Sequence, residues 1–313
     1  MNLFEKKEFI NITKKNILEF YKENFDKKYK RKYTVDYYLD LMFELINDVN
    51  NWNSISKLKI YNPIQKFNNN IPKFHWKTVQ NLFNKWSYDG IFKIGFDNFI
   101  HKKTIDINNI DLFIDTTFIN NKYGVENIGL NTDNKKKKST KISLISDNDK
   151  FIYSVSDVPI NKKKIKYKKR RKNNKKRRKQ KYIKKIKLNN KKKEKGFVHD
   201  VNTINFSIKN INKKYNFKIE LIGDKGYITS NKFYFKRKKI ELITPNKKNQ
   251  KIKKNNKKII KRKIIENTIA CIKKNERIMT RKDHKIKNYM SWIYISCLLH
   301  NIKINKSINK SIN

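Results

Sequence analysis

The sequence predicts an α/β protein in which a mixed sheet flanked by helices follows a small helical domain. Three observations favour this class. Apolar residues recur three and four positions apart in the first third of the chain, which is typical of helices. From residue 105 the pattern changes to alternating, β-branched residues. After residue 200, helical and strand patterns follow one another, as in a sheet with mixed strand directions.

The first 104 residues are expected to form the helical domain. Apolar residues line one face over 35–49, and a second helix over 75–86 carries Trp76 and Trp86 on its apolar face before Asp89-Gly90 ends it. A third helix begins at Ile91. Short helices with basic outer faces suit a helix-turn-helix-like DNA reader, in which Lys77 would contact DNA. A plain helical bundle with a tryptophan core is the alternative.

Residues 105–301 are expected to form the sheet domain. Three successive strands are predicted at 110–119, 139–146 and 150–155. A helix at 200–213, a strand at 217–222, a helix at 230–236 and a strand at 240–243 follow. Two helices at about 262–277 and 286–302 complete the domain, and 302–313 is a low-complexity tail.

A strongly basic insert interrupts this domain. Residues 161–195 contain 22 Lys and Arg and one Glu, including Arg170, Arg171, Arg177 and Arg178, four of the nine arginines in the chain. A codon bias toward A/T and selection for positive charge explain the general lysine excess equally well, but the codon bias would not favour arginine. Such a run repels itself, so we expect a disordered or transiently helical loop that binds DNA phosphates without sequence preference. A nuclear-targeting patch and an inert expansion are the alternatives.

Composition narrows the function classes. The 313 residues carry a formal net charge of +51, which favours a polyanionic partner. Hydrophobic residues make up 37% of the chain, enough for a packed core. The first residues lack the apolar core of a signal peptide, cysteines occur only at 271 and 297, and the longest apolar run, 292–299, is too short to cross a bilayer. An intracellular nucleic-acid-binding protein without a membrane segment is therefore expected.

Three acidic residues are candidate metal ligands. Asp115 lies on a predicted buried strand, where a carboxylate is costly unless it is paired or metal-bound. Asp111 shares its face and is an alternative, as is a simple strand-end cap. Asp224 follows an apolar strand between Gly223 and Gly226, at a strand end where ligands bind in α/β sheets. Ordinary turn chemistry explains this Asp equally.

Glu266 lies on a predicted helix. At 100° per residue, Arg262, Glu266 and Lys273 form a stripe within about 40° of one another, directly beside an apolar stripe. This places them at the edge of the core. An active-site helix and a solvated i,i+4 pair of Arg262 with Glu266 explain the pattern equally well.

Together these segments resemble the DDE transposases of bacterial-type insertion sequences. The resemblance rests on Ile114-Asp115-Thr116-Thr117, on Leu221 to Tyr227, and on Arg262, Glu266 and Lys273 at the spacing Tyr-x2-Arg-x3-Glu-x6-Lys. Ile259 stands at the Tyr position, and Thr116 stands where relatives often have Ser or Gly. Weaker likeness covers 75–90, 196–200 and 277–283, so the similarity spans roughly 70–300 without the insert.

The resemblance implies an RNase H-like catalytic domain. Asp115 would lie on its first strand, Asp224 after its fourth and Glu266 on a late helix. The three carboxylates would hold two Mg²⁺ ions, for which Mn²⁺ can substitute, and catalyse DNA strand cleavage and strand transfer. Arg262, Lys273 and Lys225 would contact phosphates near the scissile bond, and Tyr227 would contact phosphate or pack. His199 and Asp200 either cap the following helix or take part in function.

The expected partner is double-stranded DNA, at the element ends and at the target. Because two ends meet in strand transfer, we expect a homodimer at least on DNA. The protein would act where its DNA lies, in the cytoplasm of a prokaryote or in a nucleus or viral factory. The rival prediction is a catalytically inactive, transposase-derived DNA-binding protein. A ribosomal or chromatin-like protein would explain the charge but not the three acids.

Overall fold

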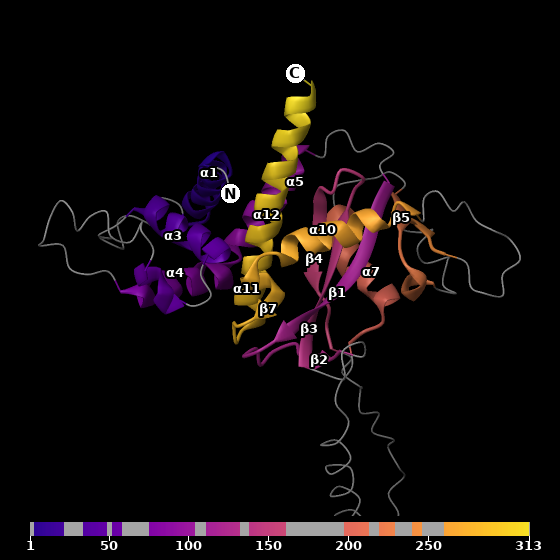
Figure 1. Cartoon of the computed structure of the whole chain (residues 1–313), viewed down its shortest axis with the longest axis horizontal. Coiled ribbons are helices and arrows are strands. Elements are labelled where there is room, and N and C mark those ends of the chain that lie inside the picture. Colours follow the sequence, from indigo (N-terminus) through magenta and orange to yellow (C-terminus); the bar gives the residue numbers. More distant parts are fainter. Residues whose placement is uncertain are drawn as a thin grey trace, which may run out of the picture.

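The computed structural model describes residues 3–21, 34–48, 52–57, 75–103, 111–131, 138–160, 197–212, 219–228, 240–245 and 260–312. Figure 1 shows helices from the N-terminal third on one side of the molecule and a sheet on the other. The insert 161–195, the predicted helix 230–236 and Ile259 lie outside the described residues.

The N-terminal part consists of helices, as predicted. They are α1 (Leu3–Tyr21), α3 (Val35–Asp48), a short 3₁₀ helix η1 (Trp52–Lys57), α4 (Trp76–Asp89) and α5 (Ile91–Lys103). Gly90 alone separates α4 from α5, and it adopts φ 78°, a conformation that glycine reaches without strain. Trp86 is fully buried, which confirms its assignment to the core. The sequence pattern did not single out α1, because its buried face includes Glu5, Thr13 and Asn16.

The sheet is built around strand β1 (Asp111–Asn121). The other strands are β2 (Gly129–Leu130), β3 (Lys138–Ser146), β4 (Ile152–Asp157), β5 (Ile219–Ile222), β6 (Ile240–Ile243) and β7 (Thr280–Arg281). The order across the sheet is β2-β3-β1-β5-β6, with β4 beside β3 and β7 beside the end of β1. β1 runs antiparallel to β3 and parallel to β5, so the sheet is mixed, as predicted.

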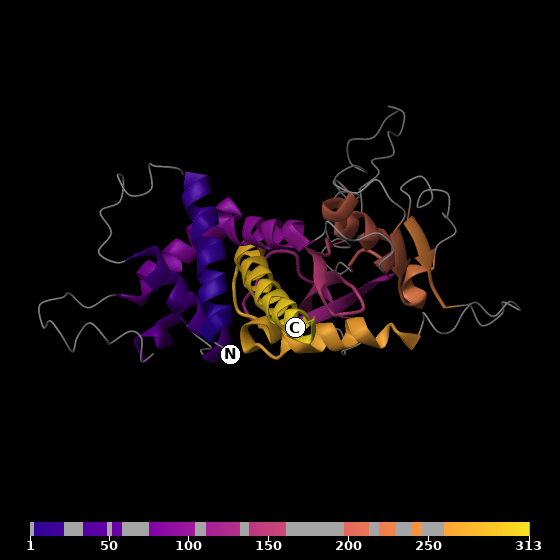
Figure 2. The same ribbon diagram turned by 90° about the horizontal axis from the view of Figure 1, so that it is seen from above.

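Two helices cover opposite faces of this sheet. In the register of β1 with β3, Thr116 pairs with Ser143 and Thr117 with Ile142, and successive side chains point to opposite faces. Helix α7 (Asp200–Asn212) contacts the Ser143 face, whereas α10 (Lys263–Lys273) contacts the Thr117 face. Figure 2 shows the strands between these two helices.

The C-terminal helices differ from their predicted bounds. The segment predicted as one helix over 262–277 divides into α10 and α11 (Glu276–Met279), because Asn275 is extended, with φ −73° and ψ 118°. Helix α12 (Ile286–Ile312) continues ten residues past the predicted end at 302, through the low-complexity tail. Ile302 is buried and Ile304 packs against the core, so the first residues of this tail contribute apolar side chains to the packed helix.

Helix α12 joins the two parts of the fold. It lies between the N-terminal helices and the sheet, where it packs on α1, α4, α5 and β4 (Figure 1). One hydrophobic cluster includes Phe83 of α4, Leu144 of β3 and Trp292 of α12. The predicted α/β class with a mixed sheet flanked by helices is therefore confirmed. None of the described helices is long and apolar enough to cross a bilayer.

Candidate active site

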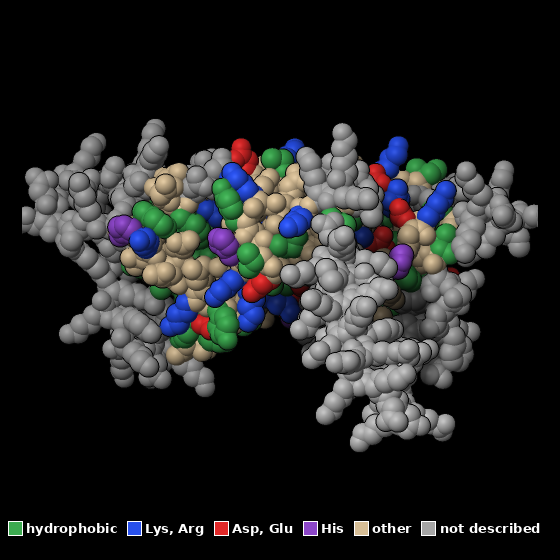
Figure 3. Space-filling view, turned by 90° about the horizontal axis from the view of Figure 1, so that it is seen from below, with side chains coloured by type: hydrophobic (Ala, Val, Ile, Leu, Met, Phe, Trp, Pro, Cys, Tyr) green, Lys and Arg blue, Asp and Glu red, His purple; other side chains and the backbone are tan. Residues whose placement is uncertain are grey.

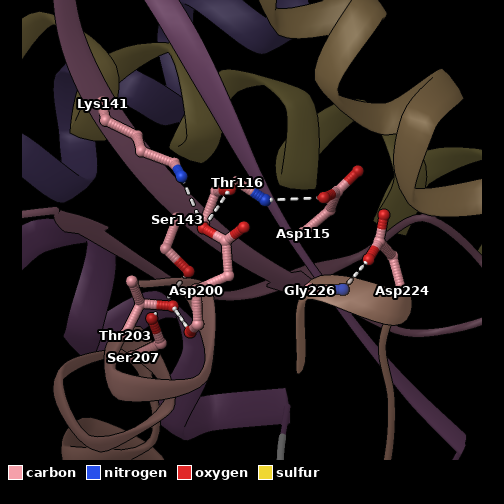
Figure 4. Close-up of polar contacts among 9 residues, drawn as sticks. All are labelled: Asp115, Thr116, Lys141, Ser143, Asp200, Thr203, Ser207, Asp224 and Gly226. Carbon is pink, nitrogen blue, oxygen red and sulfur yellow. Dashed lines mark hydrogen bonds and ion pairs between the residues drawn. The ribbon is translucent and has the colours of Figure 1, made fainter. Parts of the chain in front are cut away.

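The parallel pairing of β1 with β5 places Asp115 and Asp224 at the same level of the sheet. Phe113 is in register with Ile222, and each carboxylate comes two residues later on its own chain segment. Neighbouring strands lie about 4.8 Å apart, and residues two apart share a face. Figure 4 shows the two carboxylates pointing into the same space. Asp111 lies four residues before Asp115, about 13 Å away along the strand.

The carboxyl group of Asp115 is partly buried and lies near other negative charges. Burial raises its pKa to about 6, and the negative charges of Asp224 and Glu266 add to the increase. The backbone N–H of Thr116, which donates to Asp115 Oδ1 at 2.8 Å, and the guanidinium of Arg262 act in the opposite direction. The negative charges of Asp224 and Glu266 thus both act on Asp115, although 151 positions separate Asp115 from Glu266.

Arg262 bridges the other two acids. It immediately precedes α10, and its guanidinium lies 2.7 Å from Glu266 Oε1 and 3.9 Å from Asp224 Oδ2. The i,i+4 pair of Arg262 with Glu266, which the sequence allowed, is therefore present. Arg262 also contacts Asp224 in the turn after β5. Because Glu266 and Asp224 are each about half exposed, this arrangement faces solvent rather than the core.

Lys273 contacts the first strand. Its ammonium donates to Thr117 Oγ1 and to the carbonyl oxygen of Phe118, the latter at 3.1 Å. Burial lowers its pKa, and the charge of Asp115 partly offsets this effect. The cation predicted to bind a phosphate therefore anchors α10 on β1, beside the strand position of Asp115.

A second polar cluster lies on the other face of β1. Asp200, the first residue of α7, accepts hydrogen bonds through Oδ1 from Thr116 Oγ1 at 3.0 Å and from Lys141 Nζ (Figure 4). Lys141 comes from β3, and its side chain is only 9% exposed. The sequence predicted either a helix cap or a part in function for Asp200, and it did not single out Lys141. The signal was a lysine in the middle of a predicted strand, because a lysine that becomes buried there needs an acid as its partner.

The two glycines of the turn after β5 leave room for the side chains of neighbouring residues. A Cβ on Gly223 would lie 2.9 Å from the Tyr227 ring, and one on Gly226 would lie 2.9 Å from Asp200 Oδ2. Tyr227 is buried, and its hydroxyl faces Thr116 and Thr203 without a partner at hydrogen-bonding distance in the described part of the chain. Burial raises its pKa well above its usual value. Tyr227 therefore packs between the turn and α7, and it does not reach a phosphate.

The remaining predicted DNA contacts are placed as follows. Lys225 is exposed in the turn after Asp224, and Lys77 is exposed on the first turn of α4, with its ammonium 5.8 Å from the Trp76 ring centroid. His199 is also exposed, just before α7. Arg170, Arg171, Arg177 and Arg178 lie outside the described residues.

The three acids fit a divalent cation in chemistry. Mg²⁺ prefers oxygen ligands, and mutual repulsion of the kind seen at Asp115 is what such a cation relieves. In the geometry described, Arg262 balances the charge of Asp224 and Glu266 instead. Among the described residues, no group of three or more His, Cys, Asp or Glu is arranged around a point where a metal ion could bind.

Comparisons of the chain with protein-family models, with curated proteins and with solved structures found no match.

Proposed function

We propose that the protein is a DDE-type transposase, which binds the ends of a mobile DNA element and catalyses metal-dependent DNA strand cleavage and strand transfer. The main support is the electrostatic coupling of Asp115 to Asp224 and Glu266. These residues come from a strand, a turn and a helix that are far apart in the sequence. Structural ion pairs alone do not require two further acids whose charges act on a third carboxylate, because each additional carboxylate is repelled by the others.

The sheet topology supports an RNase H-like interpretation. β1, β3 and β4 form an antiparallel succession, and β1, β5 and β6 run parallel. Asp115 lies on the first of these five strands in chain order, and Asp224 follows the fourth. Glu266 lies on the helix that contacts β1. This order of the longer strands and the acids supports the proposal.

Different residues of the chain would have different roles in phosphoryl transfer. Asp115, Asp224 and Glu266 would hold Mg²⁺ or Mn²⁺, which supplies an activated nucleophile and charge stabilisation at the leaving oxygen. Arg262 and Lys225 lie beside these acids and would bind the phosphates that flank the scissile bond. Lys273 would act as a positioning residue, because its ammonium holds α10 against Thr117 and Phe118.

Charge supports DNA as the partner. The net charge of +51 disfavours the compact state through self-repulsion, and a polyanionic partner would neutralise it. Double-stranded DNA, an intracellular location with that DNA, and a homodimer formed at least on the paired ends follow from the proposal.

Cleavage of the DNA that flanks the reading frame tests this proposal. Purified full-length protein with Mg²⁺ should leave 3′-hydroxyl ends at the element boundary, and Asp224→Asn or Glu266→Gln should reduce the product to background. Asp149→Asn and Glu276→Gln are matched controls on exposed acids far from Asp115 in the chain, and they should retain activity. Full cleavage by the Asp224 and Glu266 variants would refute the assigned acids.

One observation favours the alternative of a catalytically inactive DNA-binding protein. Arg262 already neutralises Asp224 and Glu266, so these acids have a partner without metal. Thermal unfolding distinguishes the two functions. Stabilisation by Mg²⁺ or Mn²⁺ that Asp224→Asn removes would support the enzyme, whereas no metal effect in the native protein would support the inactive protein.

A further inference from the structure

A cavity of about 620 Å³ lies where α4 meets the segment that joins β7 to α12. Its lining does not include Asp115, Asp224 or Glu266. Its lining includes Gln80, Asn84 and Tyr88 of α4, Tyr123 after β1, and Lys285 and Lys287 before and within α12. This volume is in the range of small-molecule and nucleotide sites. Figure 3 shows the face seen from below, on which basic side chains lie among hydrophobic ones.

Two exposed aromatic rings belong to this cavity. Tyr88 is 70% exposed and Tyr123 is 49% exposed, although large aromatic side chains usually gain stability from burial. The ammonium of Lys287 lies 4.1 Å from the Tyr88 ring centroid. The His284 ring is nearly parallel to the Tyr123 ring, at 25° and 6.4 Å between centroids. Exposed rings beside cations are the platforms on which unpaired bases stack.

Buried polar groups also line the cavity. Arg277 is 4% exposed and lies between the rings of Trp52 and Trp292, at 4.9 and 4.6 Å from their centroids. Asp283 is 9% exposed. Arg277 Nε and Asp283 Oδ2 have no hydrogen-bond partner within the described part of the chain. Arg277 and Asp283 attract one another electrostatically, so they form a buried pair of opposite charges in the wall of the cavity.

The remaining polar groups favour nucleic acid over other ligands. Asn84 and Asn288 form a hydrogen bond of 2.7 Å between α4 and α12 beside the cavity, and Gln80 adds a further amide, the group that reads base edges. The one glutamate of the lining, Glu126, accepts from the Ile286 backbone N–H at 2.9 Å. The exposed ammonium groups of Lys285 and Lys287 suit flanking phosphates.

Strand β1 connects this cavity to the candidate active site. It runs from Asp115 to Asn121, which pairs with Arg281 at the start of the segment that lines the cavity. Six residues of strand span about 20 Å, which corresponds to about six nucleotides of a stacked DNA strand. A DNA strand of about six nucleotides is therefore long enough to span the distance between the two places.

We propose that this cavity binds an unpaired base of a DNA strand, stacked on Tyr88 and Tyr123, about six nucleotides from the phosphate held near Asp115. The choice of DNA as the polymer rests on the proposed function. The site itself rests on the exposed rings, the amides and the exposed lysines that line the cavity.

Binding of fluorescein-labelled dT12 to the full-length protein, measured by anisotropy in EDTA, tests this proposal. Tyr88→Ala and Tyr123→Ala should each raise the Kd for dT12 at least about five-fold, because each removes a stacking surface. Tyr88→Phe and Tyr123→Phe keep the ring and should restore binding. Phe206→Ala removes an aromatic side chain of similar exposure, 47%, from α7 and should have no effect.

Binding of duplex DNA, and the dependence of binding on salt, distinguish base stacking from electrostatic attraction. Neither alanine variant should change the Kd for a dA12·dT12 duplex more than about two-fold or alter the salt dependence for dT12, because neither changes a charge. Lys285→Gln should reduce that salt slope by about one. An unchanged Kd for dT12 in both alanine variants, or an equal loss with the duplex, would overturn the proposal. Asp224→Asn should leave dT12 binding intact, so a failure of cleavage is distinguished from a failure of this site.

Discussion

At the level of single residues, Asp115 shows how the fold changes the chemistry of a side chain. The strand pattern alone placed a carboxylate on a buried strand, and the structure adds Asp224 and Glu266 beside it. A group that resists ionisation in the absence of metal is expected at a cation site, since an acid that is already satisfied has less to gain from the ion. In the proposed function, Asp115 would therefore lower folding stability in return for cation binding.

The raised pKa of Asp115 predicts a pH-dependent gain in stability for Asp115→Asn. The unfolded carboxyl ionises near pH 3.8 and the folded one near 6, so folding stability falls as pH rises between these values and stays reduced above them. Asparagine removes this loss. Without metal, the variant should be more stable than the native protein at pH 8, by on the order of 1–3 kcal/mol, and not at pH 4.

Urea unfolding at the two pH values in EDTA measures this difference. Asp149→Asn, at an exposed turn, is the control and should show no comparable gain. An Asp115→Asn variant whose stability matches the native protein at pH 8 would contradict the burial argument. Mg²⁺ should stabilise the native protein more as pH rises toward about 7, because the ionised acid is the ligand.

At the level of elements, a buried polar seam holds α7 on the sheet. Ser207 of α7 donates to Ser143 of β3 at 2.8 Å, and Asp200 accepts from Lys141 and Thr116. The period of two along β3 puts Lys141 and Ser143 on one face. Thr116 belongs to this seam, whereas the neighbouring Asp115 faces α10. The two faces of β1 therefore carry different polar groups.

Asp200→Ala should therefore destabilise the protein strongly. It leaves the Lys141 ammonium buried without its acid, which costs about 3 kcal/mol. Lys141→Met combined with Asp200→Ala should recover most of that loss, because it removes the unpaired charge. The surface pair Lys15–Glu19 gives the comparison, and Glu19→Ala should cost less than about 0.5 kcal/mol in the same unfolding assay. Equal losses for the single and double variants would show that Asp200 acts through packing and not through charge.

At the level of the whole molecule, the basic insert begins and ends at neighbouring points. Ile160 and Phe197, just outside the segment 161–196, form an antiparallel bridge. An insert whose ends meet can vary in length at little cost to the rest of the fold, because loop closure depends only weakly on length. Its 22 basic residues are a separate source of DNA affinity.

Replacing residues 161–195 with one glycine should leave a two-residue turn between Ile160 and Phe197 and preserve the fold. The net charge falls from +51 to about +30, since 22 positive charges and one negative charge are removed. Affinity for random duplex DNA at 50 mM salt should fall at least about ten-fold, and the slope of log affinity against log salt should become shallower. Circular dichroism checks the fold. An unchanged slope would show that the insert does not contact DNA.

Local patterns of apolar residues predicted many of the helices and strands. The stretches at 35–49, 75–90 and 139–146 became α3, α4 and β3, because their side chains repeat with one clear period. The three candidate acids and their cationic neighbours were likewise visible as residues at particular spacings. Where the period was mixed, as in α1 with Glu5 and Asn16 on its buried face, the pattern did not reveal the helix.

Long-range packing settled the rest. The register of β1 with β5 puts Asp224 beside Asp115, the packing of α10 on β1 gives Lys273 its partners, and α7 brings Asp200 to Lys141. The cavity beside Tyr88 also forms only when α4 meets the start of α12. Propensity and periodicity act over a few neighbouring residues, so they specify helices, strands and candidate side chains. Which of those side chains share charge, and which remain buried without partners, depends on contacts between segments up to some two hundred positions apart.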